Sequence, residues 1–359
     1  MVQNRNSEKN KSYVSSKTSY FSPLTKRRLA NFRSNKRGFW SLRIFLILFT
    51  LTLFAEFLAN DKPLLISYDD QIYLPIFKRY KETEFGGIFE VEADYSEKEV
   101  QTMIIENGGW MIWPPIPYSY DTIDYYLPGP APYPPSKEHW LGTDNVGKDI
   151  AANLIYGVRL SFLFGLLLTF FASIIGVCAG GIQGYFGGKI DLIAQRFVEI
   201  WAGLPVLFIL IILASIVESN VFWLLGILVA FSWMALVGVV RAEFLRARNF
   251  QYVTAARALG ANSFSIMLRH VLPNAMVATL TFLPFILTGS ITLLTSLDFL
   301  GFGLPSDSPS LGRLLAQGRT NIHAPWLGLT TFLTLACMLT LLIFTGEGVR
   351  DAFDPRKEN

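Results

Sequence analysis

Charged side chains are scarce in this chain of 359 residues. Asp, Glu, Lys and Arg make up 16% of the sequence, whereas hydrophobic residues make up 51%. A soluble domain usually carries about 25% charged residues, so this chain has too little charge to cover a water-exposed surface of its size. The composition excludes an intrinsically disordered chain and predicts a protein that folds in an apolar solvent.

Cysteine, histidine and net charge are also low. The two cysteines, Cys178 and Cys337, both fall in apolar runs. This excludes a disulfide-stapled scaffold, and we expect both side chains to be small core hydrophobes. The three histidines are scattered along the chain and do not predict a metal site. A formal net charge of only +3 gives nucleic acid no overall attraction, so nucleic acid is not expected as a partner.

Long hydrophobic runs are abundant. A spanning helix needs about 20 mostly apolar residues, because hydrocarbon offers the backbone no hydrogen-bonding partner. The sequence therefore predicts an all-α membrane protein with six transmembrane helices. The six stretches are Phe39–Ala59, Leu160–Ile182, Phe197–Val217, Val221–Val240, Ala275–Leu297 and Leu327–Gly346. The first is interpreted as an uncleaved anchor, since Asn60 and Asp61 follow it instead of the small residues of a signal-peptide cleavage site.

The distribution of lysine and arginine predicts the orientation. Eleven basic residues occur up to Arg43, and the segment 241–274 holds five against the single acid Glu243. Residues 60–159 instead carry sixteen acids and eight basic residues. Because short basic segments stay in the cytoplasm, we expect both termini there and the acidic segment outside.

The predicted helices divide the chain into five parts. The first helix and the other five are separated by about a hundred residues, of which 110–135 are rich in tyrosine and proline and are expected to be extended. The parts are a basic cytoplasmic tail (1–38), the first transmembrane helix (39–59), the outer insert and approach to the second helix (60–159), a core of five transmembrane helices (160–346, with the loop 241–274), and a cytoplasmic C-terminal tail (347–359).

The predicted spans offer little for transport driven by a bound ion. The interiors of the last three contain no charged residue, whereas secondary transporters bind coupling ions near the bilayer midplane. The energy source is therefore expected on another chain. A secondary transporter or channel acting alone remains the alternative, and an outer enzyme using Asp121 and Asp124 is a weaker one.

Glycine recurs at every fourth position where the second span ends. Gly176, Gly180, Gly184 and Gly188 are expected to share one helix face. Small residues at this spacing favour close approach of a neighbouring helix.

A short polar segment interrupts the hydrophobic runs at 250–274. An alanine-rich helix is predicted from Phe250 to Leu259, ended by Gly260 at the position after the cap. A second short helix is predicted from Ser263 to His270, and Pro273 is expected to begin the next span. Small side chains on an exposed helix suit insertion into another protein's groove. A helix lying on the lipid surface is the alternative.

This segment resembles the EAA loop of ABC importer permeases. The alanines, the glycine, the Leu-Pro pair and their spacing match, while Thr254 stands where that family usually has Glu and His270 where Ile is common. The resemblance implies a coupling helix that docks on an ATPase subunit. The implied coupling residues are Tyr252, Thr254, Ala255, Ala256, Arg257, Leu259, Gly260, His270, Leu272 and Pro273.

Further segments are similar to dipeptide and oligopeptide permeases. These are Leu141–Asp149, Leu154–Arg159, Leu297–Leu304 and Gly346–Pro355, while Asn60–Leu65 and Glu106–Trp110 are similar to the Yej-type peptide (microcin C) permeases. The resemblance implies a type I importer permease fold in a Gram-negative inner membrane, with the outer insert in the periplasm.

It also implies a peptide substrate and three kinds of protein partner. The partners would be a second, different permease subunit, separate or fused ATP-binding subunits, and a periplasmic peptide-binding protein. ATP and Mg²⁺ would lie on the ATPase. This chain would then hold no cofactor and no catalytic residue of its own.

Overall fold

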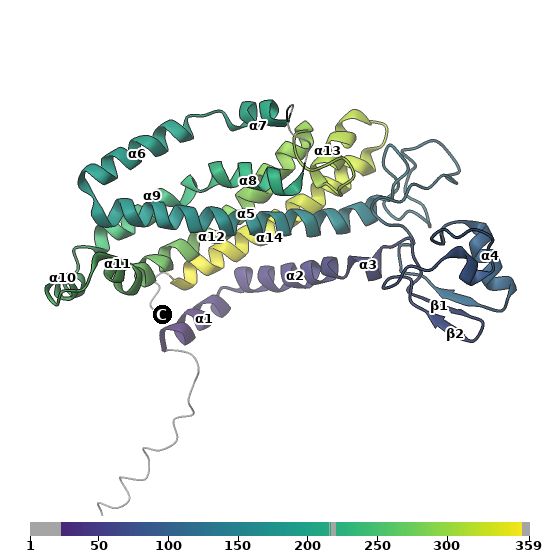
Figure 1. Cartoon of the computed structure of the whole chain (residues 1–359), viewed down its shortest axis with the longest axis horizontal. Helices are drawn as coiled ribbons and strands as arrows, with labels where there is room; N and C mark the ends of the chain where they lie inside the picture. The colour runs from purple at the N-terminus through teal and green to yellow at the C-terminus, as the bar shows by residue number, and fades with distance from the viewer. Residues whose placement is uncertain (1–22, 215, 217–219, 354–359) are drawn as a thin grey trace, which may run out of the picture.

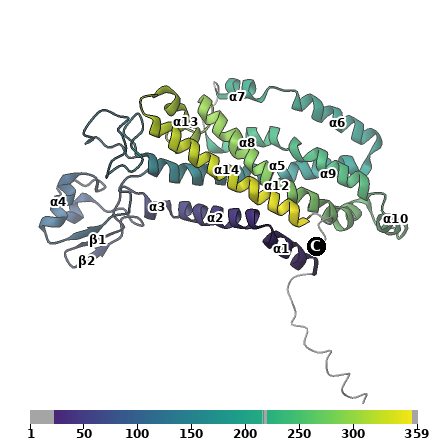
Figure 2. The same cartoon turned by 180° about the vertical axis from the view of Figure 1, so that it is seen from behind.

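Long helices run side by side, and a smaller region, residues 60–149, lies at one end of them (Figures 1 and 2). We call this smaller region the outer region. The computed structural model describes residues 23–214, 216 and 220–353. The helices are α1 (Pro23–Ser34), α2 (Lys36–Leu53), α3 (Ala55–Leu58), α4 (Lys98–Glu106), α5 (Ile150–Phe186), α6 (Gly188–Ala202), α7 (Val206–Ala214), α8 (Val221–Ser232), α9 (Met234–Ala247), α10 (Gln251–Ala258), α11 (Ser263–Ile266), α12 (Leu272–Leu300), α13 (Leu311–Thr320) and α14 (Pro325–Phe353), with a 3₁₀ turn η1 (Glu82–Phe85) and a π turn η2 (Met267–Val271). The strands are β1 (Leu65–Tyr68), β2 (Gln71–Tyr73) and β3 (Trp110–Ile112).

Four helical segments in the described part of the chain are long and apolar enough to cross a membrane. They are Ile150–Phe186, Val221–Ala247, Ser263–Leu300 and Pro325–Phe353. Each contains one of the predicted spans and extends beyond it at one or both ends, because its helical hydrogen bonding continues into the flanking sequence. The predictions of the second, fourth, fifth and sixth spans are confirmed as apolar helices.

The predicted first span forms α2 and α3. Helix α2 has 18 residues and begins with Lys36 and Arg37, and Phe54 interrupts the helix before α3 adds four residues. This pair is not among the segments of crossing length and composition. Helix α2 nevertheless packs against α5, where the rings of Phe45 and Phe49 lie 4.8 and 4.3 Å from that of Phe162.

The predicted third span is not one straight helix. Gly188–Ala202 and Val206–Leu213 meet at an angle of 64°. Pro205 lies in the break and lacks the N–H that would continue the helical ladder. Counted as one bent span, the pair brings the number of candidate spans to five. Glu218 and Ser219, which separate the predicted third and fourth spans, lie outside the described residues.

Three of the four periodic glycines bring α5 against α9. A Cβ at Gly180 would lie 2.7 Å from the carbonyl oxygen of Val237, and one at Gly184 would lie 2.5 Å from that of Arg241. Gly176 likewise faces Trp233. The fourth, Gly188, was predicted wrongly as part of this face, because α5 ends at Phe186 and Gly188 has φ +55°.

The two cysteines lie on the outer surface of the helices. Cys178 and Cys337 are both exposed and unbridged, so the prediction that they are core hydrophobes was wrong. A run of apolar residues has the same composition whether its side chains face a protein core or lipid. The sequence alone therefore did not place the two cysteines correctly.

The outer region departs from the all-α prediction. Its strands form an antiparallel sheet in the order β2-β1-β3, with Ile66 of β1 opposite Tyr73 and Met111. Ile66, Phe85 and Ile104 form its small core, with α4 covering the sheet. The proline-rich segment that follows β3 runs without helix as far as α5, as predicted.

Candidate functional site

Helix α10 projects from the end of the bundle farthest from the outer region (Figure 1). It follows α9 after a turn at Arg248–Phe250 and runs from Gln251 to Ala258. The predicted helix, Phe250 to Leu259, is confirmed, with these two residues as its caps.

The helix has a buried side and an open side. Val253 is fully buried and Ala256 is partly buried, in a cluster that includes Ile266 and Val271. The open side carries Leu259, whose surface is 88% exposed. On α10 and at its end, the other exposed residues of the predicted set are Tyr252, Thr254, Ala255, Arg257 and Gly260, and farther along the chain His270 and Pro273 are exposed as well. Because Val253 and Ala256 anchor the helix from behind, its open side is available for contact with a partner.

Gly260 ends α10 in a Schellman motif. Its φ is +82°, a conformation that side chains disfavour. The Gly260 N–H donates to the Arg257 carbonyl and the Ala261 N–H donates to the Ala256 carbonyl, at 3.0 and 3.1 Å. The predicted role of Gly260 as the helix terminator is confirmed.

The predicted second short helix is not separate from the next span. Helix α11, the π turn η2 and α12 follow without a break, and a π hydrogen bond joins the Leu272 N–H to the Met267 carbonyl. His270 is exposed on η2, while Leu272 and Pro273 form the first turn of α12. The Asn274 amide donates to the Tyr252 hydroxyl at 3.1 Å, which ties α10 to the start of α12. The loop is therefore attached to a long helix.

An ion pair missed by the sequence analysis fixes the base of this loop. The Arg241 guanidinium donates to both oxygens of Asp191, at 2.5 and 2.7 Å. Such bidentate pairs are strongly oriented. The contact joins α6 to the middle of α9, the helix that leads into α10. The partners are 50 positions apart, so no local pattern pointed to them.

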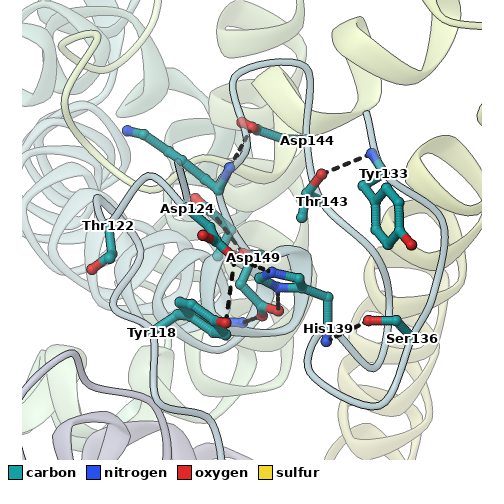
Figure 3. Close-up of polar contacts among 12 residues, drawn as sticks. Tyr118, Thr122, Asp124, Tyr133, Ser136, His139, Thr143, Asp144 and Asp149 are labelled. Atoms are coloured by element: carbon teal, nitrogen blue, oxygen red, sulfur yellow. Dashed lines mark hydrogen bonds and ion pairs between the residues drawn. The ribbon is translucent and has the colours of Figure 1, made fainter. Parts of the chain in front are cut away.

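A second polar cluster lies at the opposite end of the helical bundle, beside the first turn of α5 (Figure 3). His139 is 1% exposed, with Nδ1 2.8 Å from Asp149 and Nε2 3.1 Å from Asp124. Asp149 also caps α5 by accepting from the Ala152 N–H. The Tyr118 ring stacks on the imidazole at 4.4 Å. The cluster pins the proline-rich segment to α5, and Asp124 has a structural role in it.

This cluster predicts a pH-dependent stability. Burial lowers the pKa of His139, but hydrogen bonds and charges from Asp149 and Asp124 outweigh it and hold the pKa above 6.5. The stabilisation is then complete below about pH 6.5 and is lost as the pH rises through the raised pKa. We expect the unfolding temperature of the wild type to exceed that of His139→Gln most at acidic pH, with the gap narrowing at alkaline pH. A gap that widens with pH contradicts this assignment.

The sequence matches a known family over the helical core. Residues 172–359 match the family described as binding-protein-dependent transport system inner membrane component. Together with the packed apolar helices and the projecting α10, this match defines the class: the chain belongs to that family and is a multi-pass membrane protein.

Its relatives narrow the comparison. The chain is 58% identical over 339 residues to the inner membrane ABC transporter permease protein YejE of Escherichia coli K12, covering 94% of this chain and 99% of that protein. It is 57% identical to the peptidoglycan transport system permease protein YejE of Agrobacterium fabrum, covering 96% of each. The oligopeptide transport system permease protein OppC of Haemophilus influenzae is 32% identical, covering 67% of this chain and 77% of OppC. An inward-facing MetNI methionine ABC transporter structure covers 56% of this chain with a TM-score of 0.46 and 16% identity, a likeness too low to support a functional conclusion.

Proposed function

We propose that this chain is one membrane-spanning subunit of an ATP-driven peptide importer, and that α10 docks on a cytoplasmic ATPase. The observation that carries the proposal is the open side of α10, with Leu259 88% exposed on a helix fixed by Val253 and Gly260. Membership of a family of binding-protein-dependent transport components supports it. The remaining coupling residues of the predicted set would surround this contact.

The proposed topology has six crossings with both termini in the cytoplasm. The four long apolar segments and the bent pair supply five crossings. The sixth would be α2 with α3, whose residues Gly38 to Leu58 span about 30 Å at the helical rise of 1.5 Å per residue. The outer region, residues 60–149, would then lie in the periplasm of a Gram-negative cell, and α10 in the cytoplasm.

The proposed mechanism assigns the energy source to the partner. ATP and Mg²⁺ would bind the ATPase subunits, and closure of those subunits would move α10. Because Tyr252 is bonded to Asn274 of α12, this movement would reach the spans and turn the pathway outward. Hydrolysis would restore the inward state. This chain would supply half of the pathway, and a second, different permease subunit would supply the rest.

Peptides are the proposed substrate class, delivered by a periplasmic peptide-binding protein. Relatives bear the names of oligopeptide and peptidoglycan permeases, and the insert is similar to that of microcin C permeases. We therefore propose oligopeptides or peptide conjugates of the microcin C type.

Uptake into liposomes tests this function against a transporter or channel acting alone. Labelled oligopeptide is expected to accumulate only when this chain is assembled with its second permease and ATPase, with binding protein and ATP present. Equal accumulation by the purified chain without ATP would establish the alternative.

Arginine modification tests the docking face separately. We expect Arg257 to react with phenylglyoxal in the isolated chain and to be protected in the complex with ATPase, because it lies on the open side of α10. The reactivity of Arg246 should change less between the two states, since Arg246 is already paired with Glu243 at 2.9 Å. Arg79, 84% exposed in the outer region, is the control and should react equally in both states. Unchanged reactivity of Arg257 in the complex would favour a helix that lies on lipid.

A further inference from the structure

A polar cavity of about 700 Å³ lies where α9 and α14 end and α12 begins, and α1 lies beside it. Figures 1 and 2 both place α1 next to the C-terminal end of α14. Three arginines from three different helices line the cavity: Arg28 of α1, Arg246 of α9 and Arg350 of α14. Side chains so distant in sequence meet here because α1 packs on α14, with the Phe32 ring against Gly348.

The positive charge of this cavity is only partly neutralised. Its two acids are Glu243, which pairs with Arg246 at 2.9 Å, and Asp351, which accepts from the Asn35 amide at 3.0 Å. Within the described ranges, Arg28 and Arg350 form no ion pair with a carboxylate. Arg28 lies 4.5 Å over the Phe353 ring, which holds its guanidinium at the cavity wall.

The surrounding surface adds further positive charge. Helix α1 contains no acidic residue, and the same short stretch carries Lys26, Arg27, Arg33, Lys36 and Arg37 as well as Arg28. Guanidinium groups match the geometry of phosphate oxygens and bind them through paired hydrogen bonds. An arginine cavity that is only partly neutralised and lies inside a basic surface is therefore suited to a phosphate group.

The cavity lies near the start of α2, where Gly38 packs against Gly348 of α14. Trp40 is 56% exposed, and the Arg43 guanidinium lies 4.3 Å from the Phe39 ring and 5.4 Å from the Trp40 ring. Exposed tryptophan marks the boundary between hydrocarbon and headgroups. Arg28 precedes this boundary by twelve positions along the chain, on the side away from the apolar part of α2. Basic pockets between helices at this depth suit anionic headgroups.

We propose that the arginine cavity is a phosphate site and that an anionic phospholipid headgroup of the adjacent leaflet fills it. The lipid would bridge α1 to the ends of α9 and α14 and so fix α1 against the core. Val277 and Ala278 of α12 also line the cavity and leave an apolar wall for the glycerol part of the headgroup. The proposed lipid site is independent of the identity of the transported substrate. It is also independent of the side of the membrane on which these helix ends lie.

Native mass spectrometry of the full chain in mild detergent tests this site. The lipids are dioleoylphosphatidylglycerol and, for comparison, dioleoylphosphatidylcholine. The test variant is Arg28→Gln/Arg350→Gln, and the matched control is Arg33→Gln/Arg37→Gln, which removes the same charge from the same basic stretch outside the cavity. We expect the wild type to retain the anionic lipid preferentially and the test variant to bind it about tenfold more weakly. The control should stay within about twofold of wild type.

Two results would overturn the proposal. Equal loss of the anionic lipid in the test and control variants would mean that the basic surface binds it without a defined site. Saturable binding of inorganic phosphate by the chain in phosphatidylcholine nanodiscs, abolished in the test variant, would assign the cavity to soluble phosphate. Arg28→Lys/Arg350→Lys keeps the charge but loses the paired guanidinium hydrogen bonds, so its monodisperse fraction on size-exclusion chromatography should bind the lipid more weakly than wild type and more tightly than the glutamine variant.

Discussion

Replacing Gly260 with valine is expected to abolish peptide-dependent growth while leaving the chain in the membrane. The native φ of +82° disfavours any side chain with a Cβ by roughly 1–2 kcal/mol, and a β-branched side chain by more. Relieving this strain breaks the Schellman hydrogen bonds that set the direction of the chain between α10 and α11. The open side of α10 would then be presented at the wrong angle to the ATPase. ATP-dependent uptake in liposomes should fall at least about tenfold, which corresponds to 1.4 kcal/mol.

Gly108→Val is the matched control for this result. Gly108 has φ +79°. A Cβ added at either glycine would have no neighbouring heavy atom of the described residues within 4 Å. The two substitutions therefore impose similar backbone strain. Gly260→Val imposes it in the loop after α10, and Gly108→Val imposes it in the outer region. Uptake by Gly108→Val should remain near that of wild type. Normal uptake by Gly260→Val, or equal loss in both variants, contradicts a specific coupling role for this loop.

Replacing Gly184 with valine is expected to prevent α5 and α9 from packing. A Cβ at this position would lie 2.5 Å from the Arg241 carbonyl oxygen and 2.5 Å from the Phe244 Cβ. Neither atom is the end of a flexible side chain, so one helix has to move away. Overpacking typically costs about 1–3 kcal/mol, and contact with the backbone places this case at the upper end. The yield of monodisperse protein in mild detergent should fall severalfold, with a lower unfolding temperature.

Gly238→Val provides the comparison for helix packing. Gly238 lies in α9, and in the part of the chain that the structure describes no heavy atom outside its own helix backbone lies within 4 Å of a built Cβ. It therefore tests the cost of valine in a helix without the close approach. Its yield and unfolding temperature should stay near those of wild type. If both variants behave alike, the close contact of α5 and α9 is not what the glycines secure.

Hydropathy and local backbone chemistry made part of this structure predictable. Four predicted spans are present as helices because each carries enough consecutive apolar residues to satisfy its backbone internally. The end of α10 was predictable because Gly260 tolerates positive φ and its position follows an alanine-rich run. Local sequence thus defined the candidate loop almost to the residue.

Contacts between distant residues were not predictable in the same way. The Arg241–Asp191 pair joins α6 to α9, and the Arg159–Glu56 pair, 2.9 Å apart, joins α5 to α3. Nothing in the local sequence of either member identifies its partner. The His139 cluster had a weak local signal, a histidine ten positions before the residue that caps α5, but the third member, Asp124, came from the proline-rich segment.

The misplaced features have separate physical origins. The two cysteines lie in apolar runs, where residue type does not distinguish lipid from protein neighbours. The bend of the third span coincides with Pro205, which lacks the N–H that would continue the helical ladder. The small sheet of the outer region has strands of three or four residues, too short for an alternating pattern to identify them.

Photo-crosslinking from position 259 tests the central claim most directly. Benzoylphenylalanine replaces Leu259 on the open side of α10, and in a matched variant it replaces Ile322, which is 85% exposed between α13 and α14. When the chain is co-expressed with its second permease, ATPase and binding protein, irradiation should join position 259 to the ATPase and leave position 322 without an ATPase adduct. Failure of position 259 to crosslink in a complex that retains the ATPase, or an adduct with the ATPase from position 322, would contradict the account.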